Sequence, residues 1–231
     1  MSDTAFIVGA GSGLSASLAR LLSREGCRVA LAARNTAKLA ALAKETGALT
    51  VACDARVQGE VESAFETVAA ALGITDLVVF NAGFRVRGAI TELDPAEVEQ
   101  TLISSAFAGF LVAQAAAKRM IPRGSGAIFF TGASASIKGY ANSAPFAMGK
   151  FALRGLAQSL ARELSPQGVH VAHFVIDGAI RKGEDDARIA QRGEDGLLLP
   201  EEIAKTYLHI YRQHRSAWTW EIELRPWVEK F

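Results

Sequence analysis

Short, unbroken apolar runs alternate with longer segments of helical periodicity along almost the whole chain. Unbroken apolar runs are typical of strands that are covered on both faces, because a strand with one face in water alternates apolar and polar residues. Strands are predicted at Ala5–Val8, Arg28–Ala33, Leu49–Cys53, Leu77–Phe80, Ala127–Thr131, Val169–Ile176 and Thr219–Leu224. Helices are predicted at Ser12–Glu25, Thr36–Glu45, Gln58–Leu72, Pro95–Met120, Pro145–Leu164 and Pro200–Arg212. This alternation predicts an α/β fold with a doubly wound parallel sheet and helices on both faces.

The 231 residues contain no repeat and no linker, so a single domain over residues 1–231 is expected. The net charge of +1 argues against a nucleic acid or an anionic membrane as a partner. Residues 1–4 are not a basic region followed by an apolar run, and the apolar stretch Ala106–Ala117 is short for a membrane span. We therefore expect a soluble cytoplasmic protein. No group of Cys and His has the spacing of a metal site.

A glycine-rich turn, Gly9-Ala10-Gly11-Ser12-Gly13-Leu14, separates the first predicted strand from the first predicted helix. Glycines allow a sharp turn and leave the backbone amides open to a pyrophosphate group. The start of the helix adds unpaired N–H donors and a partial positive charge. The turn therefore favours a dinucleotide site formed by Gly9, Gly11, Ser12, Gly13 and Leu14, although tight packing alone would also require glycines.

The end of the second predicted strand indicates which dinucleotide is bound. An acidic residue at this place would bind the ribose 2′-hydroxyl of NAD, and none is present. Arg34 stands there instead and is suited to pair with a 2′-phosphate. NADP(H) is therefore favoured over NAD(H), unless Arg34 is simply an exposed residue at a strand end.

Further motifs accompany the glycine turn. Phe80-Asn81-Ala82-Gly83 follows the fourth predicted strand, Cys53-Asp54 ends the third, and a long helix contains Lys150 near its start. In these motifs, the chain resembles the single-domain branch of the short-chain dehydrogenase/reductase family, with Ser15 in the third place of the glycine motif. The resemblance implies a Rossmann fold with a seven-stranded sheet and homodimers or homotetramers packed through two long helices. It also implies cofactor contacts from Asp54, Asn81, Ala82, Gly83 and Lys150, and from Gly178 and Ile180 after the sixth strand.

The family's catalytic asparagine, serine, tyrosine and lysine are only partly retained. A tyrosine four residues before a lysine on a helix places the phenol beside the ammonium, which lowers the phenol pKa as a general acid requires. Lys150 is present, but Phe146 occupies the tyrosine position. Ala133 stands at the serine position, with Ser134 adjacent, and Ala106 stands at the asparagine position. Catalytic roles are therefore assigned to Lys150, Phe146 and Ser134, with Tyr140 or a water molecule as alternative proton donors.

Two functions remain open at this point. The first is an NADP(H)-dependent oxidoreductase that acts on a small carbonyl or alcohol substrate with an atypical proton donor. The second is a non-catalytic NAD(P)-binding protein, a sensor or an oligomer partner. Arg85 and Arg87, after the Asn-Ala-Gly turn, would either attract an acidic substrate or belong to the solvated surface.

The remaining cysteines, histidines, tryptophans and one charged segment have ordinary structural explanations, and two of these features also allow a functional one. Cys27 and Cys53 are expected to be buried thiols, and His170 and His173 to be packed in a strand. The charged segment from Arg181 to Gly196 is expected to be either a mobile flap or a plain connection. The tryptophans around the last predicted strand favour either a subunit contact or ordinary packing.

Overall fold

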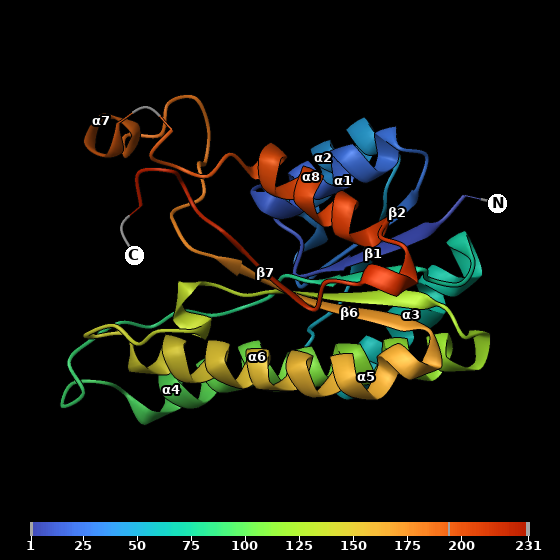
Figure 1. The fold of residues 1–231 in the computed structure, drawn as a ribbon, viewed down its shortest axis with the longest axis horizontal. Helices are drawn as coiled ribbons and strands as arrows, with labels where there is room; N and C mark the ends of the chain where they lie inside the picture. The colour runs from blue at the N-terminus through green and yellow to red at the C-terminus, as the bar shows by residue number, and fades with distance from the viewer. Residues whose placement is uncertain (1, 194, 230–231) are drawn as a thin grey trace.

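The computed structural model describes residues 2–193 and 195–229, and it has the predicted α/β architecture (Figure 1). Seven strands form one sheet in the order β3-β2-β1-β4-β5-β6-β7, and every neighbouring pair is parallel. The strands are β1 (Thr4–Val8), β2 (Arg28–Ala33), β3 (Leu49–Ala52), β4 (Leu77–Phe80), β5 (Gly126–Thr131), β6 (Val169–Ile176) and β7 (Glu221–Leu224). The strand order reverses between β1 and β4, and open α/β sheets bind ligands at such a switch point.

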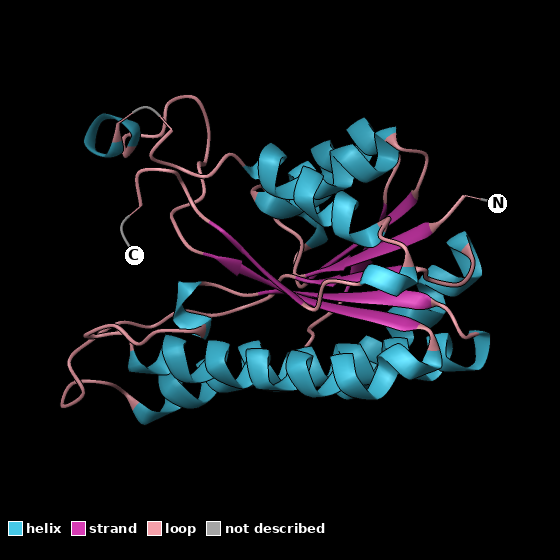
Figure 2. Ribbon diagram, viewed as in Figure 1, coloured by secondary structure: helices cyan, strands magenta, loops and turns pink. Residues whose placement is uncertain are grey.

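Helices cover both faces of this sheet (Figure 2). Helices α1, α2 and α8 lie on one face, and α3, α5 and α6 lie on the other (Figure 1). The helices are α1 (Leu14–Arg24), α2 (Ala40–Thr46), α3 (Gln58–Leu72), α4 (Pro95–Leu102), α5 (Ala108–Met120), α6 (Ala144–Leu164), α7 (Ile189–Arg192) and α8 (Pro200–Tyr211). Two separate hydrophobic cores fill the space between the sheet and these two layers.

Several predicted boundaries were wrong by a few residues, and two helices differ in kind. The first helix begins at Leu14 rather than Ser12, because the glycine turn extends to Gly13. The segment Thr36–Leu39 is a 3₁₀ turn, in which the Asn35 side chain accepts a hydrogen bond from the Ala37 amide at 3.1 Å. The predicted helix Pro95–Met120 has the expected extent, but its middle is a π-helix between α4 and α5.

This long helix continues through a 3₁₀ turn to Arg123, and Pro95–Arg123 is long and apolar enough to cross a membrane by length and composition alone. It is therefore longer than the apolar stretch that the sequence suggested. Half of its most apolar window is buried inside the fold, and core helices pass the same test.

The cysteine prediction was half right. Cys53 is buried, and burial raises the pKa of its thiol to about 11. Cys27 is only partly buried, because it lies in the turn between α1 and β2 and not within a strand. Both thiols are free.

The two strand histidines are packed, as predicted. His170 stacks on Trp218 with ring centroids 4.7 Å apart, and its Nε2 lies 2.9 Å from the Thr219 carbonyl oxygen. His173 is fully buried in β6, with its Nδ1 3.0 Å from Glu221. Trp218 thus packs on the fold, whereas Trp227 is 80% exposed.

Glu221 also pairs with Arg154 of α6, at 2.6 and 2.8 Å, so it joins α6 to β6 and β7. Burial lowers the pKa of His173 to about 4, although Glu221 opposes that effect. The imidazole is therefore neutral in the folded protein at pH values where it would gain a proton in the unfolded chain.

We predict that His173 makes the fold sensitive to acid. A folded-state pKa below the unfolded value of about 6.5 means that the unfolded chain binds more protons, so stability falls as the pH drops from about 6.5 toward 4. Between pH 7 and pH 5, this linkage removes about 2 kcal/mol from the free energy of unfolding. Urea unfolding of the wild type and of His173→Gln at both pH values measures the effect. An equal loss of stability in both proteins would contradict the assignment.

Candidate functional site

The turn between β1 and α1 forms an open cradle of backbone amides. Gly9 has a φ of +84°, and a Cβ on it would lie 2.4 Å from the Ala82 backbone nitrogen. By contrast, a Cβ on Gly11 or Gly13 would meet no atom within 4 Å. The start of α1 has no side-chain cap and no acidic residue in its first turn. The turn therefore presents open amides and an uncompensated positive helix end, which suits an anionic phosphate group.

Ser15 has a clear role in this turn. Its side chain is buried, and its hydroxyl donates to the Gly9 carbonyl at 3.4 Å. The Asn81 side-chain amide donates to the same hydroxyl at 2.7 Å. The serine therefore links the glycine turn to the segment that follows β4, which a glycine at this position could not do.

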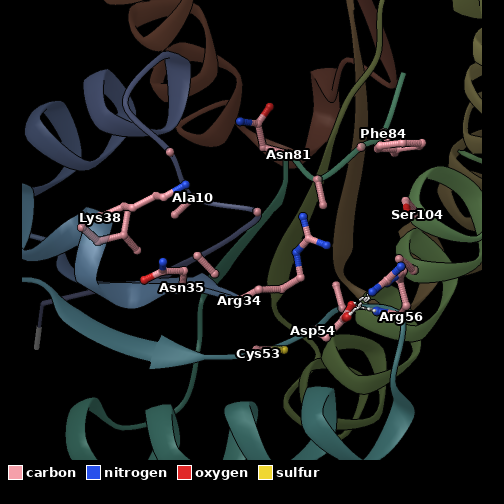
Figure 3. Close-up of a pocket in the computed structure, with 18 of the residues that line it drawn as sticks. Ala10, Arg34, Asn35, Lys38, Cys53, Asp54, Arg56, Asn81, Phe84 and Ser104 are labelled. Carbon is pink, nitrogen blue, oxygen red and sulfur yellow. Dashed lines mark hydrogen bonds and ion pairs between the residues drawn. The ribbon is translucent and has the colours of Figure 1, made fainter. Parts of the chain in front are cut away.

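A pocket of about 440 Å³ opens beside this turn, at the carboxyl ends of the strands (Figure 3). Its lining includes these predicted cofactor residues: Gly9, Gly11, Ser12, Arg34, Asp54, Asn81, Ala82 and Gly83. Figure 3 shows the Arg34 side chain extending from the end of β2 into this pocket. Arg34 is exposed and makes no hydrogen bond or ion pair with the described residues.

The same pocket contains residues that the sequence analysis missed. Lys38 follows Arg34 by four residues and lines the pocket, as do Gln100 and Ser104. In Figure 3, Ser104 lies on the side of the pocket opposite Lys38. Gln100 and Ser104 are four residues apart on one helix, so they share a face. The spacing of Gln100 and Ser104 could therefore have indicated that both side chains point the same way. Nothing in the sequence indicated that this face of the helix lies at the pocket.

Asp54 is already engaged by a neighbouring cation. Arg56 donates to both carboxylate oxygens, with distances from 2.6 to 3.1 Å, and these hydrogen bonds lower the pKa of Asp54 (Figure 3). The pair keeps Asp54 ionised at the pocket wall beside Cys53.

Lys150 lies deep in the fold rather than in this pocket. Its Nζ donates to the Thr131 carbonyl oxygen at 2.8 Å, and burial lowers the pKa of its ammonium to about 8. The Thr131 hydroxyl in turn lies 2.9 Å from the hydroxyl of the buried Tyr207. Burial raises the pKa of Tyr207 well above its usual value, so this phenol is a poor acid.

Phe146 lies one turn before Lys150 on α6, as the spacing predicted, and the Arg85 Cζ lies 4.6 Å from its ring centroid. Ser134 is partly buried at the start of the 3₁₀ turn after β5, whereas Ser136 is buried and accepts a hydrogen bond from the Ala133 amide. Tyr140 is 46% exposed. None of these hydroxyls makes a hydrogen bond with Lys150 within the described residues.

Gly178 and Ile180 lie outside the pocket lining, like Leu14, whose side chain is buried in α1, and Gly13. Asp177 before them is buried and forms ion pairs with Lys138 at 3.0 Å and Arg225 at 3.2 Å. These contacts fasten the end of β6 to the loop after β5 and to the C-terminal segment.

The segment from Arg181 to Gly196 is tied to itself and to the chain that follows. Arg188 donates to Asp186 and to the Ile180 carbonyl oxygen, and Ile180 forms a β-bridge with Leu198. Glu194 of this segment lies outside the described residues. Among the described residues, no group of three or more His, Cys, Asp or Glu side chains could hold a metal ion.

Comparison with known proteins agrees with this geometry. The short chain dehydrogenase family model matches residues 3–181. The chain belongs to the short-chain dehydrogenase/reductase family. It is 30% identical to a mitochondrial borneol dehydrogenase of Lavandula x intermedia over 214 residues, which are 89% of this chain and 82% of that protein.

Solved structures of this oxidoreductase family superpose over almost the whole chain. A short-chain dehydrogenase from Rhodopseudomonas palustris has 35% identity and a TM-score of 0.84, and the match covers 97% of this chain and 99% of that one. A metagenomic short-chain oxidoreductase in complex with NADP has 28% identity and a TM-score of 0.83, with coverages of 97% and 98%. The resemblance and the fold class predicted from the sequence are thus confirmed.

The π-helix Ile103–Phe107 contains Ala106, which the resemblance aligns with the family's catalytic asparagine. The adjacent Ser105 is fully buried against Gly149 of α6, and its hydroxyl has no hydrogen-bond partner within the described residues. π-Helical turns are frequent at functional sites. The chain therefore has the π-helical turn, but it has alanine where the resemblance aligns the asparagine.

We predict that Gly9→Ala mainly destabilises the fold, whereas Gly11→Ala mainly weakens nucleotide binding. Gly9→Ala combines a left-handed backbone with a clash against the Ala82 backbone, so it lowers the free energy of unfolding by more than about 2 kcal/mol. Gly11→Ala points a methyl group into open space and changes stability by less than about 0.5 kcal/mol. Denaturant unfolding tests both effects, and NADPH titration of Gly11→Ala should show weakened binding. Similar stability losses in the two variants would contradict this description of the cradle.

Proposed function

We propose that this protein is an NADP(H)-dependent oxidoreductase that acts on a small carbonyl or alcohol substrate with an atypical proton donor. The observation that carries this proposal is the pocket at the switch point, which combines open glycine amides with the unpaired cation of Arg34. In the bound state, the nucleotide supplies or accepts a hydride. The residues around it determine which nucleotide binds and where the proton goes.

The groups that line the pocket match the parts of NADP(H). The open amides of the glycine turn would hold the pyrophosphate, and Arg34 and Lys38 would pair with the 2′-phosphate. The segment Asn81–Gly83 forms the wall beside the turn. Beyond this lining, the buried Lys150 would bind the hydroxyls of the nicotinamide ribose, since its ammonium is largely charged below pH 8.

With Phe146 at the tyrosine position, another group must donate the proton to the substrate oxygen. Reduction of a carbonyl adds a hydride to the carbon and a proton to the oxygen, and a benzyl side chain can supply neither a proton nor a hydrogen bond. Loss of a positioned acid costs about 10²–10⁴-fold in rate. We assign the proton to a water molecule near the Lys150 ammonium, with Ser134 as a second hydrogen-bond donor to the substrate oxygen.

The absence of a phenol from Phe146 also favours a second candidate, a non-catalytic NAD(P)-binding protein. Both candidates use the same pocket and differ only in whether turnover follows binding.

Two copies of the chain are proposed to pair through the outer face of α5 and α6. Phe107 and Phe110 stack on each other with centroids 6.2 Å apart, and both are exposed, as is Phe151 of α6. Exposed aromatic side chains grouped on one face are typical of a protein interface. Such a dimer would join the helices at the bottom of Figure 1.

Arg34 is predicted to set the preference for NADPH. Arg34→Gln should weaken NADPH binding at least about tenfold, because a charge-assisted pair with the 2′-phosphate is lost, and should leave NADH binding nearly unchanged. The control is Arg24→Gln, an exposed arginine at the end of α1 that does not line the pocket. Fluorescence titration of both nucleotides measures the affinities. Equal or tighter binding of NADH by the wild type would refute the assignment of Arg34.

Phe146→Tyr is predicted to increase carbonyl reduction at least about tenfold, because it restores an acid beside the Lys150 ammonium. The rate of NADPH oxidation over a panel of small ketones and aldehydes measures the effect, and Phe146→Leu is the control. Turnover in the tyrosine variant alone would favour the non-catalytic candidate. A fast wild-type rate that the tyrosine does not raise would show that an efficient proton donor is already present elsewhere.

A further inference from the structure

An arginine lies over the side chain that replaces the family's tyrosine. The Arg85 Cζ is 4.6 Å from the centroid of the Phe146 ring. Arg85 belongs to the loop after β4, which continues directly from the pocket wall at Gly83 and Phe84. The same loop is joined to the segment before α6, because the Gly88 amide donates to the Asn142 carbonyl at 3.1 Å. The fold therefore holds this guanidinium over Phe146, next to the pocket wall at Phe84.

The guanidinium keeps its hydrogen-bond donors free. A cation–π contact uses the positive charge and none of the five N–H groups. Arg85 is exposed and makes no hydrogen bond or ion pair with any described residue. Most arginines in the described part of the chain are paired with a carboxylate, as Arg56, Arg123 and Arg188 are.

The charges around Arg85 are also unbalanced. Burial and then the charge of Arg87 lower the pKa of the Arg85 guanidinium, and no carboxylate acts on it. Two cations without an anion create a local positive potential around the loop after β4. Such a potential favours an anionic ligand from solution.

Phe146 creates the need for this ligand contact. A substrate in this site has no phenol to hold its carbonyl oxygen, so another group must fix its orientation. A guanidinium fork matches the two oxygens of a carboxylate. We propose that Arg85 binds the carboxylate of the substrate, so that the substrates are small oxo acids and the corresponding hydroxy acids. This inference rests on the proposed oxidoreductase function.

The test compares acids with their neutral esters. The probes are 2-oxobutanoate and 4-oxopentanoate and the methyl ester of each, titrated by calorimetry in the presence of saturating NADP⁺. No hydride is available in that complex, so the readout is binding and not turnover. A separate titration with NADP⁺ alone tests the proposed function. The proteins are the wild type, Arg85→Gln and the matched control Arg87→Gln, each checked by thermal unfolding.

We expect the wild type to bind at least one acid at least about tenfold more tightly than its ester. Arg85→Gln should remove that difference, and Arg87→Gln should change it by less than about threefold. NADP⁺ binding without any preference for acids would overturn the role of Arg85 and leave the proposed function intact. Equal effects of the two substitutions would also overturn it, because they would indicate a diffuse charge effect. Failure to bind NADP⁺ would overturn the proposed function itself.

Discussion

The close approach of Gly9 to the backbone of Ala82 is the contact on which the site depends. It brings the end of β1 against the end of β4, where the strand order of the sheet reverses, and only a residue without a side chain fits there. On the side of Gly9 the turn is packed against backbone, whereas Gly11 and Gly13 at the start of α1 face open space. The Ser15 hydroxyl, which bonds to both Gly9 and Asn81, then joins the segment after β1 to the segment after β4. We propose that this arrangement holds a phosphate group of the cofactor.

The reaction end of the site is organised by burial and charge. Lys150 is buried, with the Thr131 carbonyl oxygen as its hydrogen-bond acceptor among the described residues, and the cost of this desolvation appears in its lowered pKa. Beside it, Phe146 offers a flat apolar surface under the guanidinium of Arg85. We propose that a site with two cations and no phenol orients an anionic substrate by electrostatics and takes its proton from solvent or a hydroxyl. This proposal would separate the chain chemically from relatives with a tyrosine at the position of Phe146.

Much of this structure could be predicted from the sequence, because it depends on local patterns. Unbroken apolar runs identified the strands, and the glycine turn and Arg34 identified much of the pocket. Features that depend on contacts between distant segments were not predictable. The ion pairs of Asp177 with Lys138 and Arg225 join three separate parts of the chain. Likewise, the sequence did not decide whether Arg85 belongs to the solvated surface or contacts a ligand. Its position over Phe146 depends on how the loop after β4 meets the segment before α6.

A crystal structure of the protein grown with NADPH tests the central claim most directly. The account predicts a dinucleotide across the start of α1, with its pyrophosphate on the amides of Gly11–Gly13 and its 2′-phosphate beside Arg34; the amides of Gly9 and Ala10 already donate to the Ala32 carbonyl oxygen. It also predicts that the Phe146 ring lies near the nicotinamide with no protein phenol within reach of the hydride-bearing carbon. Full occupancy of NADPH elsewhere on the molecule, or no bound nucleotide at saturating concentration, would contradict the account.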